Sequence, residues 1–86
     1  MDNMNNTAKM DCLGRAIATL REEQGYSQER LAKTSNCKRT EIVKIETGDT
    51  EPSLSVLMRI ARSLDVKLSA LIRRAGKLSA AGECKI

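Results

Sequence analysis

The residues best suited to chemistry lie in one short segment near the middle of the chain. The run KRTEIVKIETG combines cationic, hydroxyl and carboxylate side chains with two isoleucines, Ile42 and Ile45. These isoleucines are one helical turn apart, so they predict the buried face of a short helix. The polar side chains are then expected to point outward, mostly from the first turn and a half of that helix: Lys38, Arg39, Thr40, Glu41 and Lys44.

An outward face of this kind can form directed hydrogen bonds with base edges in the major groove of DNA. Arginine can bind guanine O6 and N7 together, threonine offers a hydroxyl and a methyl group, and a carboxylate can accept from cytosine N4. Arg39 is therefore the first candidate for base contact, followed by Thr40 and Lys44, with Lys38 adding a cation. Glu41 could instead repel phosphates and act only against wrong sites. The simpler alternative is a solvated polar face, as on most exposed helices.

Catalysis and metal binding are not indicated. The chain has no histidine, no pair of carboxylates on one predicted helix face and no glycine-rich phosphate loop, and it is too short to build a pocket. Its three cysteines, Cys12, Cys37 and Cys84, are far apart and include no Cys-x-x-Cys pair. Cys84 is interpreted as a solvent-exposed thiol. We expect no cofactor, no metal and no small-molecule ligand.

The elements that would present the polar face form two short helices around a sharp break. Ser27 can cap a helix that begins at Gln28. Asn36 tolerates a left-handed backbone better than other non-glycine residues, so a turn of three residues is favourable there. Ala32 supplies the small side chain that a steep helix crossing beside such a turn requires. This spacing, which ends at Gly48, is typical of a helix-turn-helix.

Helical spacing of aliphatic residues predicts an all-α domain with five helices. We expect a flexible arm over residues 1–8, the folded domain over residues 9–75 and a flexible tail over residues 76–86. The expected helices cover about residues 11–24, 28–34, 38–47, 54–64 and 68–74.

Composition agrees with a small nucleic-acid-binding domain. The chain of 86 residues fits one domain, and Tyr26 as its single aromatic residue requires an aliphatic core. The net charge of +4 is compatible with a polyanionic partner, although it carries little weight alone. No stretch approaches the roughly 20 apolar residues of a membrane span, and the N-terminus lacks the apolar core of a signal peptide. We expect a cytoplasmic protein without membrane contact.

Three runs of sequence together resemble a known family. LREEQGYSQERLA, IVKIETG and EPSLSVLMRIARSLDV are similar to landmarks of the phage-repressor and Cro-like helix-turn-helix domains, and the similarity extends from about Leu13 to about Ile72. The resemblance implies a five-helix fold of the lambda-repressor type and the same base-contacting positions as above. Cys37 stands where the family usually has a small apolar turn residue, so it is interpreted as a buried filler, with redox sensing as the alternative.

The resemblance also implies contacts outside the recognition helix, which is the predicted helix over residues 38–47. Gln28 resembles the glutamine with which the family binds a DNA phosphate while bracing the recognition helix. Arg21 and Glu46 match an arginine and a glutamate that commonly join the first helix to the end of the recognition helix. Further phosphate candidates, which could equally be caps or helix-start residues, lie at three helix ends: Ser27, Thr47, Ser53 and Ser55.

Two features depart from the family pattern. Asp49 and Glu51 lie in the loop where relatives often carry cations, which argues against tight contact between that loop and phosphate. Lys38 stands where a serine or threonine cap is usual, so the start of the recognition helix is expected to be weaker.

One short helix offers two or three base contacts, and that is too few to select a site in a genome. A two-fold dimer would double them, so we expect a homodimer with a self-complementary apolar patch. The expected interface is in the last helix, although these residues could instead complete the monomer core: Leu68, Leu71 and Ile72.

Two classes of function remain from the sequence. The first is a homodimeric transcriptional regulator that binds a pseudo-palindromic operator on double-stranded DNA, acts on its own gene, and blocks or recruits RNA polymerase. Within this class the SNCKRTEIVKIETG run resembles controller proteins of restriction-modification operons, and a phage or mobile-element repressor fits nearly as well. The second class is an antitoxin whose tail binds a partner toxin.

Overall fold

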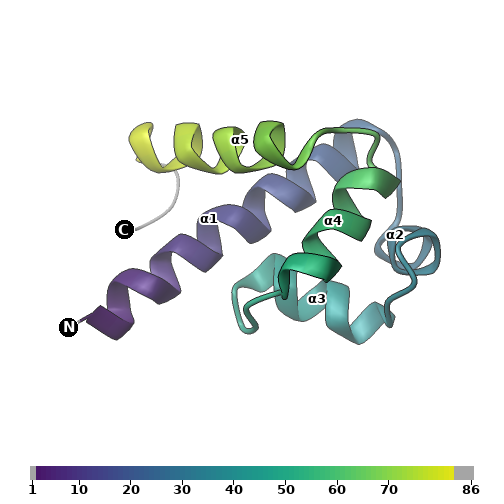
Figure 1. Ribbon diagram of the computed structural model, residues 1–86, viewed down its shortest axis with the longest axis horizontal. Coiled ribbons are helices and arrows are strands. Elements are labelled where there is room, and N and C mark those ends of the chain that lie inside the picture. The colour runs from purple at the N-terminus through teal and green to yellow at the C-terminus, as the bar shows by residue number, and fades with distance from the viewer. Residues whose placement is uncertain (1, 83–86) are drawn as a thin grey trace.

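A computed structural model describes the backbone of residues 2–82 and the side chains of residues 12–82. The described chain is entirely helical apart from its turns (Figure 1). The long first helix crosses the molecule, and the last helix runs on the opposite side from the third. The helices are α1 (Asp2–Glu23), α2 (Gln28–Thr34), α3 (Arg39–Thr47), α4 (Leu54–Ser63) and α5 (Leu68–Ala80).

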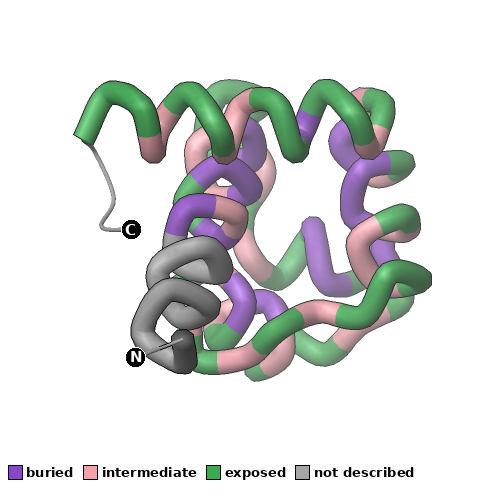
Figure 2. The backbone as a smooth tube through the Cα atoms, turned by 60° about the vertical axis from the view of Figure 1, so that its left-hand side comes forward, coloured by how far each residue is buried: buried purple, intermediate pink, exposed green. Residues whose placement is uncertain are grey.

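The core is built from aliphatic side chains contributed by every helix. Figure 2 shows the buried segments on the inner sides of the helices and the exposed segments outside. Burying a leucine or isoleucine contributes about 1.5–3 kcal/mol relative to leaving it exposed, so these side chains hold the helices together. The central residues are fully buried: Ile17, Leu31, Ile42, Ile60, Leu64 and Leu71.

The expected turn chemistry is present at the ends of the helices. The Ser27 hydroxyl accepts a hydrogen bond from the Arg30 amide at 3.0 Å, and the Ser53 hydroxyl accepts from the Val56 amide at 3.2 Å. Asn36 adopts the left-handed conformation at φ 59°, and Gly48 ends α3 at φ 84°. Local sequence therefore determines where α2, α3 and α4 begin or end.

Two predicted helix bounds are wrong. The first helix begins at Asp2 rather than near residue 11, because no glycine or proline interrupts residues 2–12 and extending an existing helix costs little. The last helix continues past Arg74 to Ala80, because Ala75 and Leu78 extend the apolar stripe of Leu71 and pack against the core. Residues 2–8 of the expected arm and residues 76–80 of the expected tail are therefore helical. The expectation for Cys84 falls outside the described residues.

The assignment of Leu71 to a dimer surface is also wrong. Its side chain is fully buried in the core of the monomer, where α5 packs on α1. Leu68 is half-buried and Ile72 is 53% exposed. The stripe of α5 that carries Leu71 therefore faces inward, and of the three predicted interface residues only Leu68 and Ile72 remain accessible at the surface.

A close approach between α1 and the end of α3 explains a glycine in the middle of a helix. A Cβ atom built on Gly14 would lie 2.1 Å from the carbonyl oxygen of Ile45 and 2.9 Å from that of Glu46. Both contacts are with backbone, which cannot move aside as a flexible side chain could. Gly14 therefore lets the last turn of α3 rest directly on α1.

Gly14→Ala is expected to lower the free energy of unfolding by about 1–3 kcal/mol, the usual cost of overpacking. The loss of stability is expected even though alanine is more favourable than glycine within a helix by about 1 kcal/mol. Gly76→Ala is the matched control, because Gly76 lies within α5 and a Cβ there meets nothing within 4 Å. That variant should gain stability in the same urea titration. Equal effects of the two substitutions would contradict the close approach.

Candidate nucleic-acid interface

The outward face of α3 carries the residues expected to contact bases. Arg39, Thr40 and Lys44 are exposed, as is Lys38 immediately before the helix, and Glu41 is half-buried. Ile42 and Ile45 anchor the opposite face, and they are 0% and 2% exposed. The helix therefore presents donors, a hydroxyl and cations to solvent while its other side is fixed in the core.

Val43 belongs to the same outer surface and is missing from the predicted set. It is half-buried, and helical spacing places it one turn from both Thr40 and Thr47. The sequence signal that could have found it is an aliphatic residue in this helix that does not share the buried face of Ile42 and Ile45. A valine there can contact the methyl group of thymine but cannot form a hydrogen bond.

The start of α3 is held weakly by its own residues. Lys38 occupies the N-cap position, and its side chain makes no capping hydrogen bond. Glu41 Oε1 accepts from the Lys38 amide at 3.4 Å, which is long for a hydrogen bond. This contact uses part of the acceptor capacity of Glu41, and the acidic group also lies favourably in the first turn of the helix.

The end of α3 is fixed by a hydrogen-bonded carboxylate. Arg21 Nε donates to Glu46 Oε2 at 2.7 Å, and Arg21 Nη2 donates to Glu46 Oε1 at 3.2 Å. Arg21 Nη1 also donates to the Tyr26 carbonyl oxygen at 2.7 Å. The Arg21 and Glu46 side chains are only 11% and 5% exposed. The hydrogen bond to Glu46 is the main cause that raises the pKa of Arg21 above its usual value, so the guanidinium stays charged at neutral pH.

Gln28 completes this network from the start of α2. Its Nε2 donates to Glu46 Oε1 at 2.9 Å, so one carboxylate joins α1, α2 and α3. The bond uses one of the two hydrogens on Nε2, and the second can still donate to a phosphate. The bracing that the family resemblance implies is present, and the phosphate contact stays a prediction.

The hydroxyl candidates for phosphate contact are already engaged with the backbone or with each other. Ser27 and Ser53 accept from amides, and the Ser53 and Ser55 hydroxyls lie 3.3 Å apart. Thr47 Oγ1 donates to the Val43 carbonyl oxygen at 3.0 Å. Phosphate oxygens only accept hydrogen bonds, so Thr47 would have to break this bond to donate to one, whereas Ser27 keeps its hydroxyl hydrogen.

The remaining sequence expectations concern the turn, the acidic loop and other ligands. Cys37 is half-buried rather than fully buried, and its Sγ lies 3.5 Å from the Ser35 carbonyl oxygen. Asp49 and Glu51 are exposed in the loop after α3, where they would repel phosphate.

Within the described part of the chain, no cluster of side chains could hold a metal ion, and no helix is long and apolar enough to cross a membrane.

The fold and the placement of α2 and α3 agree with a family match. The model of the helix-turn-helix family matches residues 17–71, which covers the core of the domain. The protein therefore belongs to the helix-turn-helix family of the phage-repressor (XRE) type. The predicted all-α helix-turn-helix fold is confirmed.

The proteins that this chain resembles in sequence include bacterial and phage regulators. The chain is 36% identical over 52 residues to YgzD of Bacillus subtilis, an uncharacterized HTH-type transcriptional regulator, and this match spans 60% of the chain and 79% of YgzD. It is 33% identical over 60 residues to the immunity repressor of Bacillus phage phi105, which covers 70% of the chain but 42% of that repressor. The longer relatives thus contain sequence that this match does not reach.

Solved structures of similar fold include a controller protein. The restriction-modification controller protein C.AhdI from Aeromonas hydrophila is 31% identical, with a TM-score of 0.73 over 74% of this chain and 97% of that protein. The clp gene regulator ClgR from Corynebacterium glutamicum has a TM-score of 0.77 at 22% identity, over 83% of this chain and 94% of that one, and shows the shared fold.

Glu46→Ala is expected to lower the free energy of unfolding by about 3–5 kcal/mol, because it leaves the buried Arg21 guanidinium with only the exposed Glu22 carboxylate, 3.6 Å away, as a charged partner. The double variant Arg21→Met with Glu46→Leu removes both charges. In urea denaturation it should lose less stability than the sum of the losses in the single variants Arg21→Met and Glu46→Leu. Strict additivity would mean that Arg21 and Glu46 do not depend on each other.

Proposed function

We propose that this protein is a transcriptional regulator that binds double-stranded DNA at a specific operator through α3. The observation that carries the proposal is the outward face of α3, where Arg39, Thr40 and Lys44 are exposed while Glu46 fixes the end of the helix. A helix inserted into the major groove must be held rigidly, because each base contact depends on direction. Val43 joins this reading surface as a thymine-contacting residue.

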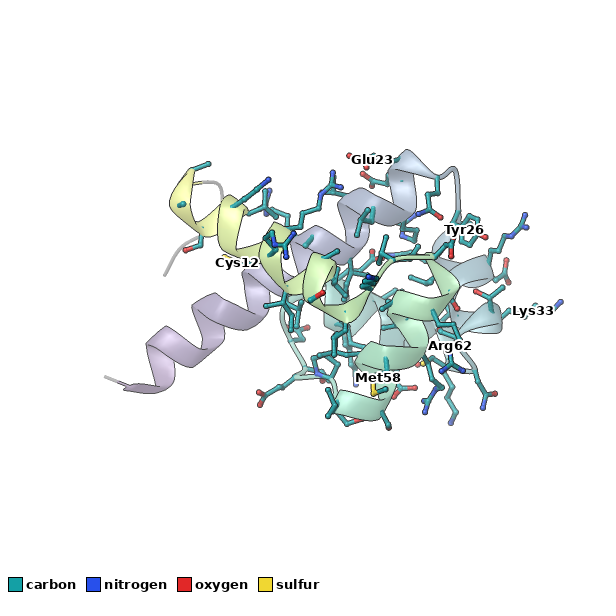
Figure 3. All side chains as sticks on the ribbon, turned by 45° about the horizontal axis from the view of Figure 1, so that its top comes forward. Cys12, Glu23, Tyr26, Lys33, Met58 and Arg62 are labelled. Atoms are coloured by element: carbon teal, nitrogen blue, oxygen red, sulfur yellow. The ribbon has the colours of Figure 1, made fainter. Side chains whose placement is uncertain are left out.

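We further propose that the protein acts as a homodimer through α4 and α5. Leu54, Met58 and Ile72 are large apolar residues that are 63%, 48% and 53% exposed. Figure 3 shows Met58 on the outer side of α4. A hollow of about 470 Å³ where α4 meets α5 is lined by Met58 and Leu68, and its charged border consists of Arg62, Asp65 and Lys67. The exposed apolar surface of α4 and α5 replaces the predicted patch centred on Leu71.

A second copy of the chain is the occupant that best suits this surface. Two α3 helices related by two-fold symmetry would contact half-sites about 34 Å apart and double the number of base contacts. The proposed operator lies in the promoter of the protein's own gene, where occupancy by the dimer would block or recruit RNA polymerase. The similarity to the controller protein C.AhdI and to a phage immunity repressor supports a role as a regulator or repressor.

Arg39→Ala should weaken binding to the selected operator by about 1–3 kcal/mol and relax selection at one base pair, because a bidentate guanine contact carries sequence information. Gln28→Ala should weaken binding to all sequences and change base preference less than Arg39→Ala does, since a phosphate contact carries no sequence information and Arg21 still holds Glu46. Both variants can be compared with the wild type by selection from a randomised half-site. The assignment of α3 fails if Gln28→Ala alters base preference and Arg39→Ala leaves it unchanged.

Met58→Glu combined with Ile72→Glu should give a folded monomer that binds the operator much more weakly, because charges enter the proposed dimer surface. Leu71→Ala should instead lower the free energy of unfolding by about 2–5 kcal/mol, as expected for a buried leucine. Sedimentation and thermal melting separate the two effects. A doubly substituted protein that remains dimeric would place the interface elsewhere.

A further inference from the structure

Arg59, on α4, contacts the turn that precedes the recognition helix. Its Nε donates to the Ser35 carbonyl oxygen at 2.9 Å, and its Nη2 lies 3.9 Å from Cys37 Sγ. The Arg59 side chain is half-buried, and 24 residues separate it from Ser35 in sequence. The contact therefore ties α4 to the turn between α2 and α3.

The opposite ends of α3 are held by different means. At its C-terminal end, Glu46 bonds Arg21 and Gln28, and Gly14 allows direct contact with α1. At its N-terminal end the local cap is weak, because the Lys38 side chain does not cap the helix and the Glu41 contact is long. The first turn, which carries Arg39 and Thr40, thus depends on the conformation of the preceding turn.

We propose that Arg59 is a positioning residue for base reading, which it controls by fixing the Ser35–Cys37 turn and hence the direction of the first turn of α3. This inference rests on the proposed function, because it concerns the same reading surface. A guanidinium suits the role, since its planar array of donors can hold the Ser35 oxygen through Nε while Nη2 remains beside Cys37. A small displacement of a directed contact is enough to lose much of its contribution.

The test compares Arg59→Met, which retains the apolar stem, with Arg59→Lys, which retains the charge and one hydrogen-bonding group. Arg15→Met is the matched control, because Arg15 is exposed on α1, outside α3 and outside the α4 and α5 surface proposed for the dimer. In selection from a randomised half-site, Arg59→Met should reduce preference about three- to tenfold at the base pair that Arg39 selects. Arg59→Lys should lose less preference, and Arg15→Met should leave the preference unchanged.

Amide hydrogen exchange provides a readout that needs no DNA. The amides of Cys37 and Ile42 bond the carbonyl oxygens of Ala32 and Lys38, whereas the Asp49 amide bonds Lys44 at the far end of α3. Arg59→Met should speed exchange at Cys37 and Ile42 at least about threefold relative to Asp49. Uniform acceleration, or an equal loss of preference at every base pair, would overturn the proposal in favour of general stabilisation.

The two readouts separate this proposal from the proposed function. If the wild-type protein selects no sequence, the proposed function fails, and the exchange comparison alone decides whether Arg59 holds the turn. If the wild type selects a sequence but Arg59→Met leaves base preference and exchange unchanged, Arg59 does not position α3. Arg59→Lys keeps both readouts measurable should Arg59→Met fail to fold.

Discussion

The carboxylate of Glu46 is the contact on which the orientation of the recognition helix depends. It lies at the end of α3, is nearly inaccessible to solvent, and accepts hydrogen bonds from α1 through Arg21 and from α2 through Gln28. Burying a charge is costly unless its hydrogen bonds are satisfied, so this carboxylate disfavours arrangements in which the three helices separate. Its contribution is specificity of arrangement more than net stability, because an apolar contact could stabilise the core as well.

Glycine at position 14 makes that arrangement possible. The Ile45 and Glu46 carbonyl groups lie so close to α1 that any side chain at position 14 would collide with them. The same helix that supplies Arg21 therefore also supplies the flat surface on which α3 rests. Together these contacts let a nine-residue helix keep a fixed direction, although an isolated helix of this length would not be stable in water.

Elements governed by local chemistry were predictable from the sequence, and those governed by distant packing were not. Ser27, Asn36 and Gly48 determine their own backbone through caps and left-handed turns, and the structure shows each where it was expected. The burial of Leu71 depends instead on which face of α5 meets α1, and the amphipathic pattern alone could not separate a core stripe from a surface stripe. Arg59 escaped prediction for a similar reason, since its partner is a carbonyl oxygen 24 residues away.

The candidate reading surface and the scaffold place opposite demands on α3. Residues that can bind bases must remain polar and exposed, so Arg39, Thr40 and Lys44 contribute little to folding. Lys38 adds a cation where a capping side chain would have strengthened the helix. The stability that the outer face and the first turn lack must then come from Ile42 and Ile45 in the core and from contacts made by the other helices. A small domain can therefore change its outer α3 residues, and with them its sequence preference, while Gly14, Arg21 and Glu46 keep the helix in place.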